Sequence, residues 1–111
     1  MSRQEAVARA ADYFDRGAFR AALARRVALP TESQTGEGLE KLHAYLTGEM
    51  IPTLEKLGFT CRVVENSVAG YGPFLIAERH EDDKLPSIVS YGHGDLVFGQ
   101  EGSWRAGLSP W

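Results

Sequence analysis

The sequence predicts an α/β protein, α+β within these 111 residues, with N-terminal helices packed on a small mixed three-stranded sheet. Two observations predict it. Leucines and a methionine recur every three or four residues from Leu39 to Leu57, which is the spacing of one helix face. After Gly58 the apolar period changes to two, which is typical of strands. We therefore expect helices before Gly58 and strands after it.

Two helices are expected over Ser2 to Val27, with a break near Gly17. Ser2 and Glu5 have the spacing of a capping box, in which each side chain accepts a hydrogen bond from the other residue's backbone. Glycine weakens a helix because its backbone is the most flexible. Pro30 ends the second helix, since the residue before a proline avoids the helical conformation. The arginines of these helices are expected on a solvated face.

A third helix is expected over Glu37 to Leu57. Pro52 lies inside this pattern. It should kink or break the helix, because proline has no N–H and collides with the preceding turn. Gly58 suits the position just after a helix, where a left-handed residue ends it.

Three strands are expected, at Phe59–Glu65, Phe74–Arg79 and Ser87–Tyr91. Alternating apolar residues indicate the first. A short turn rich in glycine and serine leads to the second, which favours an antiparallel hairpin. The third is a compact run of β-branched and aromatic residues after Pro86, which is typical of a buried strand.

Composition narrows the class of protein. A net charge of −3 gives no electrostatic reason to expect nucleic acid or a membrane surface as a partner. No apolar run approaches the roughly 20 residues of a membrane span, and the N-terminus lacks an apolar secretion signal. The single Cys61 excludes an internal disulfide and fits a reducing compartment. We expect a cytoplasmic protein.

The candidate site is the run Gly92-His93-Gly94-Asp95, which follows the third expected strand. His93 and Asp95 are two residues apart, so in an extended chain both side chains point to the same face. A carboxylate that accepts one ring N–H leaves the other ring nitrogen free, which is how metal-binding histidines are commonly oriented. The alternative interpretation of these residues is a surface turn with an incidental ion pair.

The residues around this motif resemble one family. The pattern continues through Asp95-Leu96-Val97, a short polar loop, Trp104 and Pro110-Trp111, and Leu29-Pro30-Thr31-Glu32-Ser33 is similar to the family's first loop. This is the family of zinc-dependent amidohydrolases and exopeptidases that includes acetylornithine deacetylase, succinyl-diaminopimelate desuccinylase, aminoacylase and the glutamate carboxypeptidases. The chain departs from it at Phe98-Gly99, where the family usually has a proline.

The resemblance implies that residues 1–111 are the N-terminal part of a zinc-exopeptidase-like catalytic domain. It implies that His93 ligates one of two zinc ions, and that Asp95 is the catalytic carboxylate that orients this imidazole. Cobalt or manganese would suit the same ligands. The implied substrates are small N-acyl amino acids or peptides. Because the other ligands and the general base have no counterparts that we can assign, we expect weak zinc binding and no activity from this chain alone.

Two other interpretations stay open. One is a non-catalytic α+β interaction or oligomerisation module, in which Gly-His-Gly-Asp is a turn and the tail aromatics form a binding patch. The other is a regulatory or dimerisation fragment. An open sheet edge and an uncovered face would favour self-association. Because the glycine-rich tail offers Trp104 and Trp111 no partner to pack on, we expect the front part of a longer enzyme.

Overall fold

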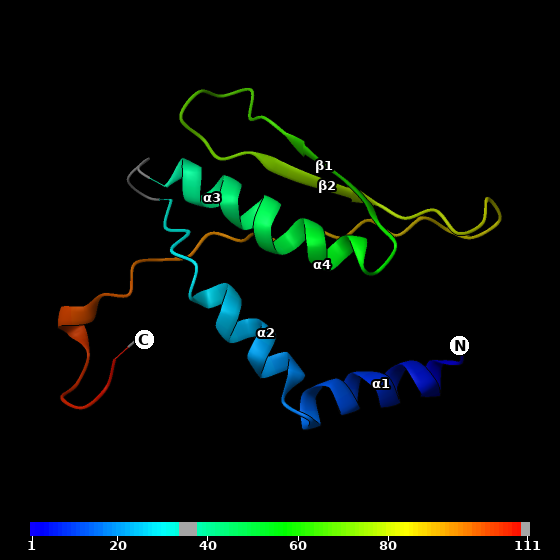
Figure 1. The fold of residues 1–111 in the computed structure, drawn as a ribbon, viewed down its shortest axis with the longest axis horizontal. Coiled ribbons are helices and arrows are strands. Elements are labelled where there is room, and N and C mark those ends of the chain that lie inside the picture. Colours follow the sequence, from blue (N-terminus) through cyan, green and yellow to red (C-terminus); the bar gives the residue numbers. More distant parts are fainter. Residues whose placement is uncertain (34–37, 110–111) are drawn as a thin grey trace.

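The helices up to Glu55 precede the two strands, and a single 3-10 turn follows them, in the computed structural model, which describes residues 1–33 and 38–109 (Figure 1). The elements are α1 (Arg3–Asp15), α2 (Ala18–Val27), α3 (Leu39–Tyr45), the π-helical turn η1 (Leu46–Met50), α4 (Ile51–Glu55), β1 (Thr60–Val64), β2 (Phe74–Glu78) and the 3-10 turn η2 (Glu101–Ser103). The run α3–η1–α4 lies against the hairpin, and α1 with α2 extends away as an arm (Figure 1). The predicted α+β class is confirmed. Within the described ranges, no helix is long and apolar enough to cross a membrane.

The arm is built as the sequence predicts. Ser2 and Glu5 form the capping box at the start of α1, where the Ser2 hydroxyl accepts the Glu5 N–H at 3.2 Å and the Glu5 carboxylate accepts the Ser2 N–H at 2.6 Å. Gly17, with φ of 76°, separates α1 from α2 in a left-handed conformation that a side chain would disfavour. The rings of Phe14 and Phe19 lie 6.0 Å apart across this break.

Two arginines at the end of α2 attach the arm to the η1 turn. Arg25 donates two hydrogen bonds to the Glu49 carboxylate, at 2.8 and 2.9 Å, and Arg26 donates one at 3.2 Å. The Glu49 side chain is only 11% exposed, while Arg25 keeps 58% of its surface in solvent. These two arginines therefore connect elements, which differs from the purely solvated face that the sequence predicted.

Pro52 explains the π-helical turn. Proline cannot donate a hydrogen bond to the preceding turn, and its ring collides with the carbonyl four residues earlier. The helix widens into η1 over Leu46–Met50 and then resumes as α4 with Pro52 in its first turn. A π-bulge is one of the known ways in which a helix absorbs such a conflict. The predicted interruption is confirmed, and the helical run ends before Gly58 as expected.

The strands β1 and β2 form the predicted antiparallel hairpin, with a register that runs from Thr60↔Glu78 to Val64↔Phe74. Arg79 follows β2 and donates a hydrogen bond to the Leu57 carbonyl at 2.7 Å. This bond ties the exit of the hairpin to the end of the helical run. Cys61 in β1 is half-buried, and burial raises the pKa of its thiol, so it is not an activated nucleophile.

The predicted third strand at Ser87–Tyr91 is not formed, and the mixed three-stranded sheet is corrected to a two-stranded antiparallel one in the described part of the chain. Ile88, Val89 and Tyr91 are 91, 94 and 87% exposed. A strand needs a neighbouring edge that pairs its backbone N–H and C=O groups. No described segment offers these residues such an edge. Their composition favours a strand, but their backbone groups have no strand to pair with.

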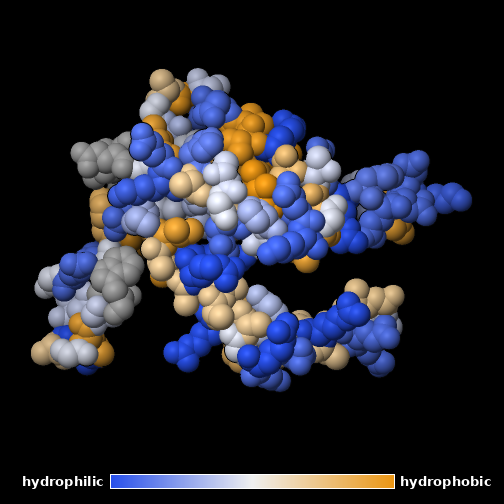
Figure 2. Space-filling view, viewed as in Figure 1, coloured by the Kyte–Doolittle hydropathy of each residue, from blue (hydrophilic) through white to orange (hydrophobic). Residues whose placement is uncertain are grey.

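The molecule is open, and its apolar side chains are poorly covered. No apolar side chain among the described residues is fully buried. The radius of gyration is 17.3 Å, against about 13 Å for a compact domain of this size. The accessible surface is 9334 Å², against about 6,100 Å² for a compact monomer of this mass. Figure 2 shows apolar atoms at the surface beside hydrophilic ones.

The segment after Phe98 forms a small turn of its own, drawn in orange and red in Figure 1. The Trp104 indole N–H donates to the Gly99 carbonyl at 2.7 Å and closes a loop around η2. Trp104 nevertheless remains 46% exposed. Its ring therefore has only part of the packing surface that a large aromatic side chain normally finds.

The contact between Glu49 and the two arginines generates a prediction of stability against pH. The hydrogen bond from Arg25, followed by that from Arg26, holds the pKa of Glu49 below its ordinary value of 4.5. A lowered folded-state pKa means that the stabilisation is present above the ordinary pKa and is lost as pH falls through the folded one.

We expect Glu49→Gln to lower the midpoint of urea unfolding at pH 7, followed by helical circular dichroism, and to flatten the decline of that midpoint below pH 4.5. Glu55→Gln is the matched control, because Glu55 is exposed on α4. Equal effects of the two substitutions would show that the contact does not stabilise the arm.

Candidate functional site

His93 and Asp95 form the hydrogen-bonded pair that their spacing predicts. The distance from His93 Nδ1 to Asp95 Oδ1 is 2.9 Å, and the two side chains are 72% and 40% exposed. The pair lies in an extended segment without strand pairing, not at the end of a third strand. Its geometry therefore depends on contacts other than a sheet.

The charge on Asp95 determines which nitrogen of His93 is available. The hydrogen bond from Ser33, followed by that from His93, holds the pKa of Asp95 below its ordinary value, so the carboxylate is ionised at neutral pH. An ionised carboxylate can only accept hydrogen bonds. The proton of the neutral imidazole therefore lies on Nδ1, and Nε2 keeps its lone pair. A lone pair on Nε2 is what a metal ion or an incoming proton requires.

Ser33 holds the second oxygen of Asp95. Its hydroxyl donates to Oδ2 at 2.9 Å, while Oδ1 faces His93. Both oxygens of the carboxylate are thus engaged by side chains. Asp95 is placed to orient the imidazole, since a carboxylate acting as a ligand would have to give up one of these contacts.

Thr31 joins the loop before α3 to the segment that carries the pair. Its hydroxyl donates to the Gly94 carbonyl at 2.7 Å, and its own carbonyl accepts the Leu96 N–H at 3.1 Å. Glu32 and Leu96 form a parallel β-bridge beside these bonds. Thr31 is 1% exposed, which is exceptional in so open a molecule. The cyan and orange parts of the chain meet here in Figure 1.

Glycine is needed at position 94 because the ring of Tyr45 lies against it. The sequence did not predict this contact. A Cβ atom added at Gly94 would overlap the ring of Tyr45, which comes from the last turn of α3. The same atom added at Gly92 would meet nothing within 4 Å. Both glycines would let another group come close to the backbone. Of the two, only Gly94 has such a neighbour, the Tyr45 ring.

Sequence reasoning assigned roles to His93 and Asp95 but none to Thr31, Ser33 or Tyr45. For the first two a signal existed, because they belong to the run Leu29 to Ser33 that resembles the family's first loop. Nothing in the sequence connects Tyr45 with Gly94, since the two are joined only through the folded backbone. The structure adds all three residues to the surroundings of the pair.

The described residues do not make a complete zinc site. Zinc takes about four ligands in a structural site and three with a water in a catalytic one. Among residues 1–33 and 38–109, no group of three or more His, Cys, Asp or Glu side chains could hold a metal ion. His93 offers one nitrogen, and Asp95 is already engaged by Ser33 and His93. A metal bound tightly at His93 therefore needs further ligands from elsewhere.

The other exposed histidine–aspartate pair provides a comparison. His80 Nε2 lies 3.1 Å from Asp83 Oδ1 in the charged loop after β2, and the side chains are 73% and 96% exposed. No hydrogen bond from a distant segment holds Asp83 among the described residues. His80 thus has a similar carboxylate partner and similar exposure without the surrounding support that His93 has.

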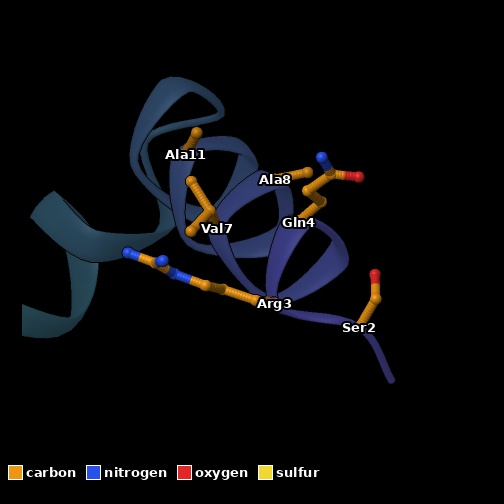
Figure 3. Close-up of a pocket in the computed structure, with 6 residues that line it drawn as sticks. All are labelled: Ser2, Arg3, Gln4, Val7, Ala8 and Ala11. Atoms are coloured by element: carbon orange, nitrogen blue, oxygen red, sulfur yellow. The ribbon is translucent and has the colours of Figure 1, made fainter.

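A hollow on the arm is unrelated to this pair. It is lined by Ser2, Arg3, Gln4, Val7, Ala8 and Ala11 (Figure 3). All six are exposed, and they run from the N-cap Ser2 along α1 to Ala11. Residues of a single helix cannot enclose a ligand, so this hollow is an open helix surface and offers no binding site.

Comparisons with known proteins leave the chain without an assigned relative: no family model, curated protein or solved structure matches it.

The Ser33 hydroxyl generates a prediction for the charge of Asp95. Ser33→Ala removes the largest influence that lowers the pKa of Asp95, so that pKa should rise toward its ordinary value. The measurement is an NMR titration of the Asp95 side-chain carboxyl carbon. Ser90→Ala is the control, because Ser90 is exposed and makes no hydrogen bond with Asp95 in the described part of the chain. An unchanged titration in Ser33→Ala would mean that the hydroxyl does not bind Oδ2 in solution.

The contact between Gly94 and Tyr45 generates a second prediction. Gly94→Ala should destabilise the fold by about 1–3 kcal/mol, the usual cost of inserting an atom into an occupied space. It should also shift the NMR signals of the Tyr45 ring and of His93. Gly92→Ala is the matched control and should change the unfolding free energy by about 0.5 kcal/mol or less. If both variants behaved alike, Tyr45 would not lie over Gly94.

Proposed function

We propose that this chain is the N-terminal part of the catalytic domain of a metal-dependent hydrolase that cleaves amide or peptide bonds in N-acyl amino acids or small peptides. His93 is its metal ligand, through Nε2, and Asp95 is the carboxylate that orients the imidazole. The observation that carries the proposal is the 2.9 Å hydrogen bond between Nδ1 and an aspartate whose other oxygen is itself held.

The support around the pair argues against an incidental ion pair. Hydrogen bonds from residues more than 60 positions earlier in the chain hold Asp95 and the carbonyl of Gly94. A surface ion pair in a turn needs no such bonds, and it normally contributes little. Partners that hold a ligand-orienting carboxylate are, by contrast, the usual second layer of a metal site. His80 and Asp83 illustrate the unsupported arrangement within the same molecule.

The proposal requires additional protein. The remaining ligands and the general base would come from residues outside those described, and zinc, cobalt or manganese would suit an imidazole ligand. An open molecule with exposed apolar side chains is consistent with a part that normally contacts further structure. No catalytic step is assigned to residues 1–111 alone.

A second candidate function is a non-catalytic interaction module. The apolar residues of the segment 87–91, exposed to about nine-tenths, favour it. In this candidate the His93–Asp95 pair has only a structural role. Substituting His93 should then change neither metal content nor hydrolytic activity. The effect of His93→Ala on metal content and activity therefore distinguishes the two candidates.

The decisive assay compares the 111-residue chain with the full reading frame of its gene, each supplied with zinc and an N-acyl amino acid. We expect metal-dependent hydrolysis by the longer protein and none by the short chain. His93→Ala should remove metal and activity together, because a ligand is lost. Asp95→Ala should retain more metal and lose roughly 10–100-fold in activity, as is typical when a ligand's orienting partner is removed.

His80→Ala is the matched control for His93→Ala, since both imidazoles contact an aspartate and are similarly exposed. It should leave metal content and rate unchanged. Full activity in the short chain, or a longer protein that is indifferent to His93→Ala, would contradict the assignment.

A further inference from the structure

The hydrogen bonds of Glu49 and the contacts of Gly94 belong to one closed series of contacts. Glu49 lies four residues after Tyr45 in the helical run, which is about one helical turn. Thr31 lies five residues after Arg26, which also binds Glu49. The ring of Tyr45 and the hydroxyl of Thr31 both reach Gly94. The segment that contains α2 and Thr31 therefore meets the helical run at two places, directly at Glu49 and through Gly94.

The linker between Arg26 and Thr31 is short and internally hydrogen-bonded. The N–H of Leu29 donates to the Arg26 carbonyl at 3.1 Å, and the N–H of Thr31 donates to the Leu29 carbonyl at 2.8 Å. Pro30 lies between these bonds, and its ring fixes its own φ angle. A displacement at the end of α2 therefore reaches Thr31, because no loose loop lies between them to absorb it.

Glu49 holds α2 against the helical run. Among residues 1–33 and 38–109, its three hydrogen bonds from Arg25 and Arg26 are the ones that join α2 to that run. The Glu49 side chain is only 11% exposed, so water competes for it less than for an ordinary surface ion pair. Arg25 binds both carboxylate oxygens at once, which fixes the orientation as well as the distance.

We propose that Arg25 and Glu49 are positioning residues for the pair formed by His93 and Asp95, although neither forms a hydrogen bond or ion pair with it in the described part of the chain. Their contact keeps the two groups that hold Gly94, one hydroxyl and one ring, at the separation at which both reach it. Gly94 lies between the two members of the pair, so its position sets the direction of both side chains. The catalytic meaning of this arrangement rests on the proposed function, but the arrangement is testable without any hydrolysis.

The competing interpretation is that this contact does no more than attach the arm. Its loss would then release α1 and α2 and leave the surroundings of Gly94 unchanged. If the contact positions the pair, its loss also loosens the bonds around Gly94. The Leu96 N–H reports on these bonds, because it donates to the Thr31 carbonyl at 3.1 Å.

The test is amide hydrogen exchange and NMR of the 111-residue chain that carries Arg25→Gln or Glu49→Gln. In both variants we expect the Leu96 N–H to exchange more than about threefold faster, which is the increase in local opening that follows the loss of a hydrogen-bonded contact. The preference of the neutral His93 ring for a proton on Nδ1, measured at alkaline pH, should fall as well.

Arg20→Gln is the matched control, because Arg20 is exposed on the same helix α2. It should change neither the exchange of Leu96 nor the tautomer of His93. The amides of the hairpin β1–β2 are an internal control for general stability, and they should accelerate less than the Leu96 N–H in both variants.

Three results would overturn the inference: parent-like exchange at Leu96 with a parent-like His93 tautomer in both variants, an equal effect of Arg20→Gln, or an equal acceleration of the hairpin amides, which would mean a general loss of stability. Hydrolysis is not among the readouts, so a failure of the proposed function changes none of these outcomes.

Discussion

The contact between Thr31 and the segment Gly94–Leu96 is the constraint on which the rest of this structure depends. It is the point where residues more than 60 positions apart are bonded through both a side chain and the backbone. Thr31 is also the one fully buried side chain in the described part of a molecule without a closed apolar core. The buried Thr31 hydroxyl needs the Gly94 carbonyl as its acceptor, because an unpaired polar group on a buried residue is costly. Without this contact, the C-terminal segment would have little to fix its position.

The same contact brings Ser33 and Tyr45 close to the His93–Asp95 pair. Ser33 follows Thr31 by two residues and so reaches Asp95, which follows Gly94. Tyr45 lies over Gly94 from the helix that begins just after this loop. The hydrogen bonds from Arg25 and Arg26 to Glu49 attach the arm to η1, in the helical run that also carries Tyr45. The pair His93–Asp95 is therefore held by a small set of polar contacts and not by a sheet.

Local features of this fold were predictable from the sequence, and non-local ones were not. The capping box at Ser2, the break at Gly17 and the disturbance near Pro52 depend on residues a few positions apart, and all three are present. The pair His93–Asp95 is equally local. Strand pairing at Ser87–Tyr91, the contact of Glu49 with two arginines, and the position of Tyr45 depend on the folded backbone. The composition of Ser87–Tyr91 indicates a strand but cannot indicate which edge it pairs with.

The central claim is that Asp95 fixes the His93 ring with its proton on Nδ1, so that Nε2 is free to act as a ligand. The most direct test is the tautomer of the neutral imidazole, measured by long-range ¹H–¹⁵N NMR correlations on the labelled chain at alkaline pH. Our account predicts a protonated Nδ1 and an unprotonated Nε2 for His93, whereas His80, which faces Asp83 through Nε2, should not favour the Nδ1 tautomer. A protonated Nε2 at His93, or averaging between tautomers equal to that of His80, would contradict it.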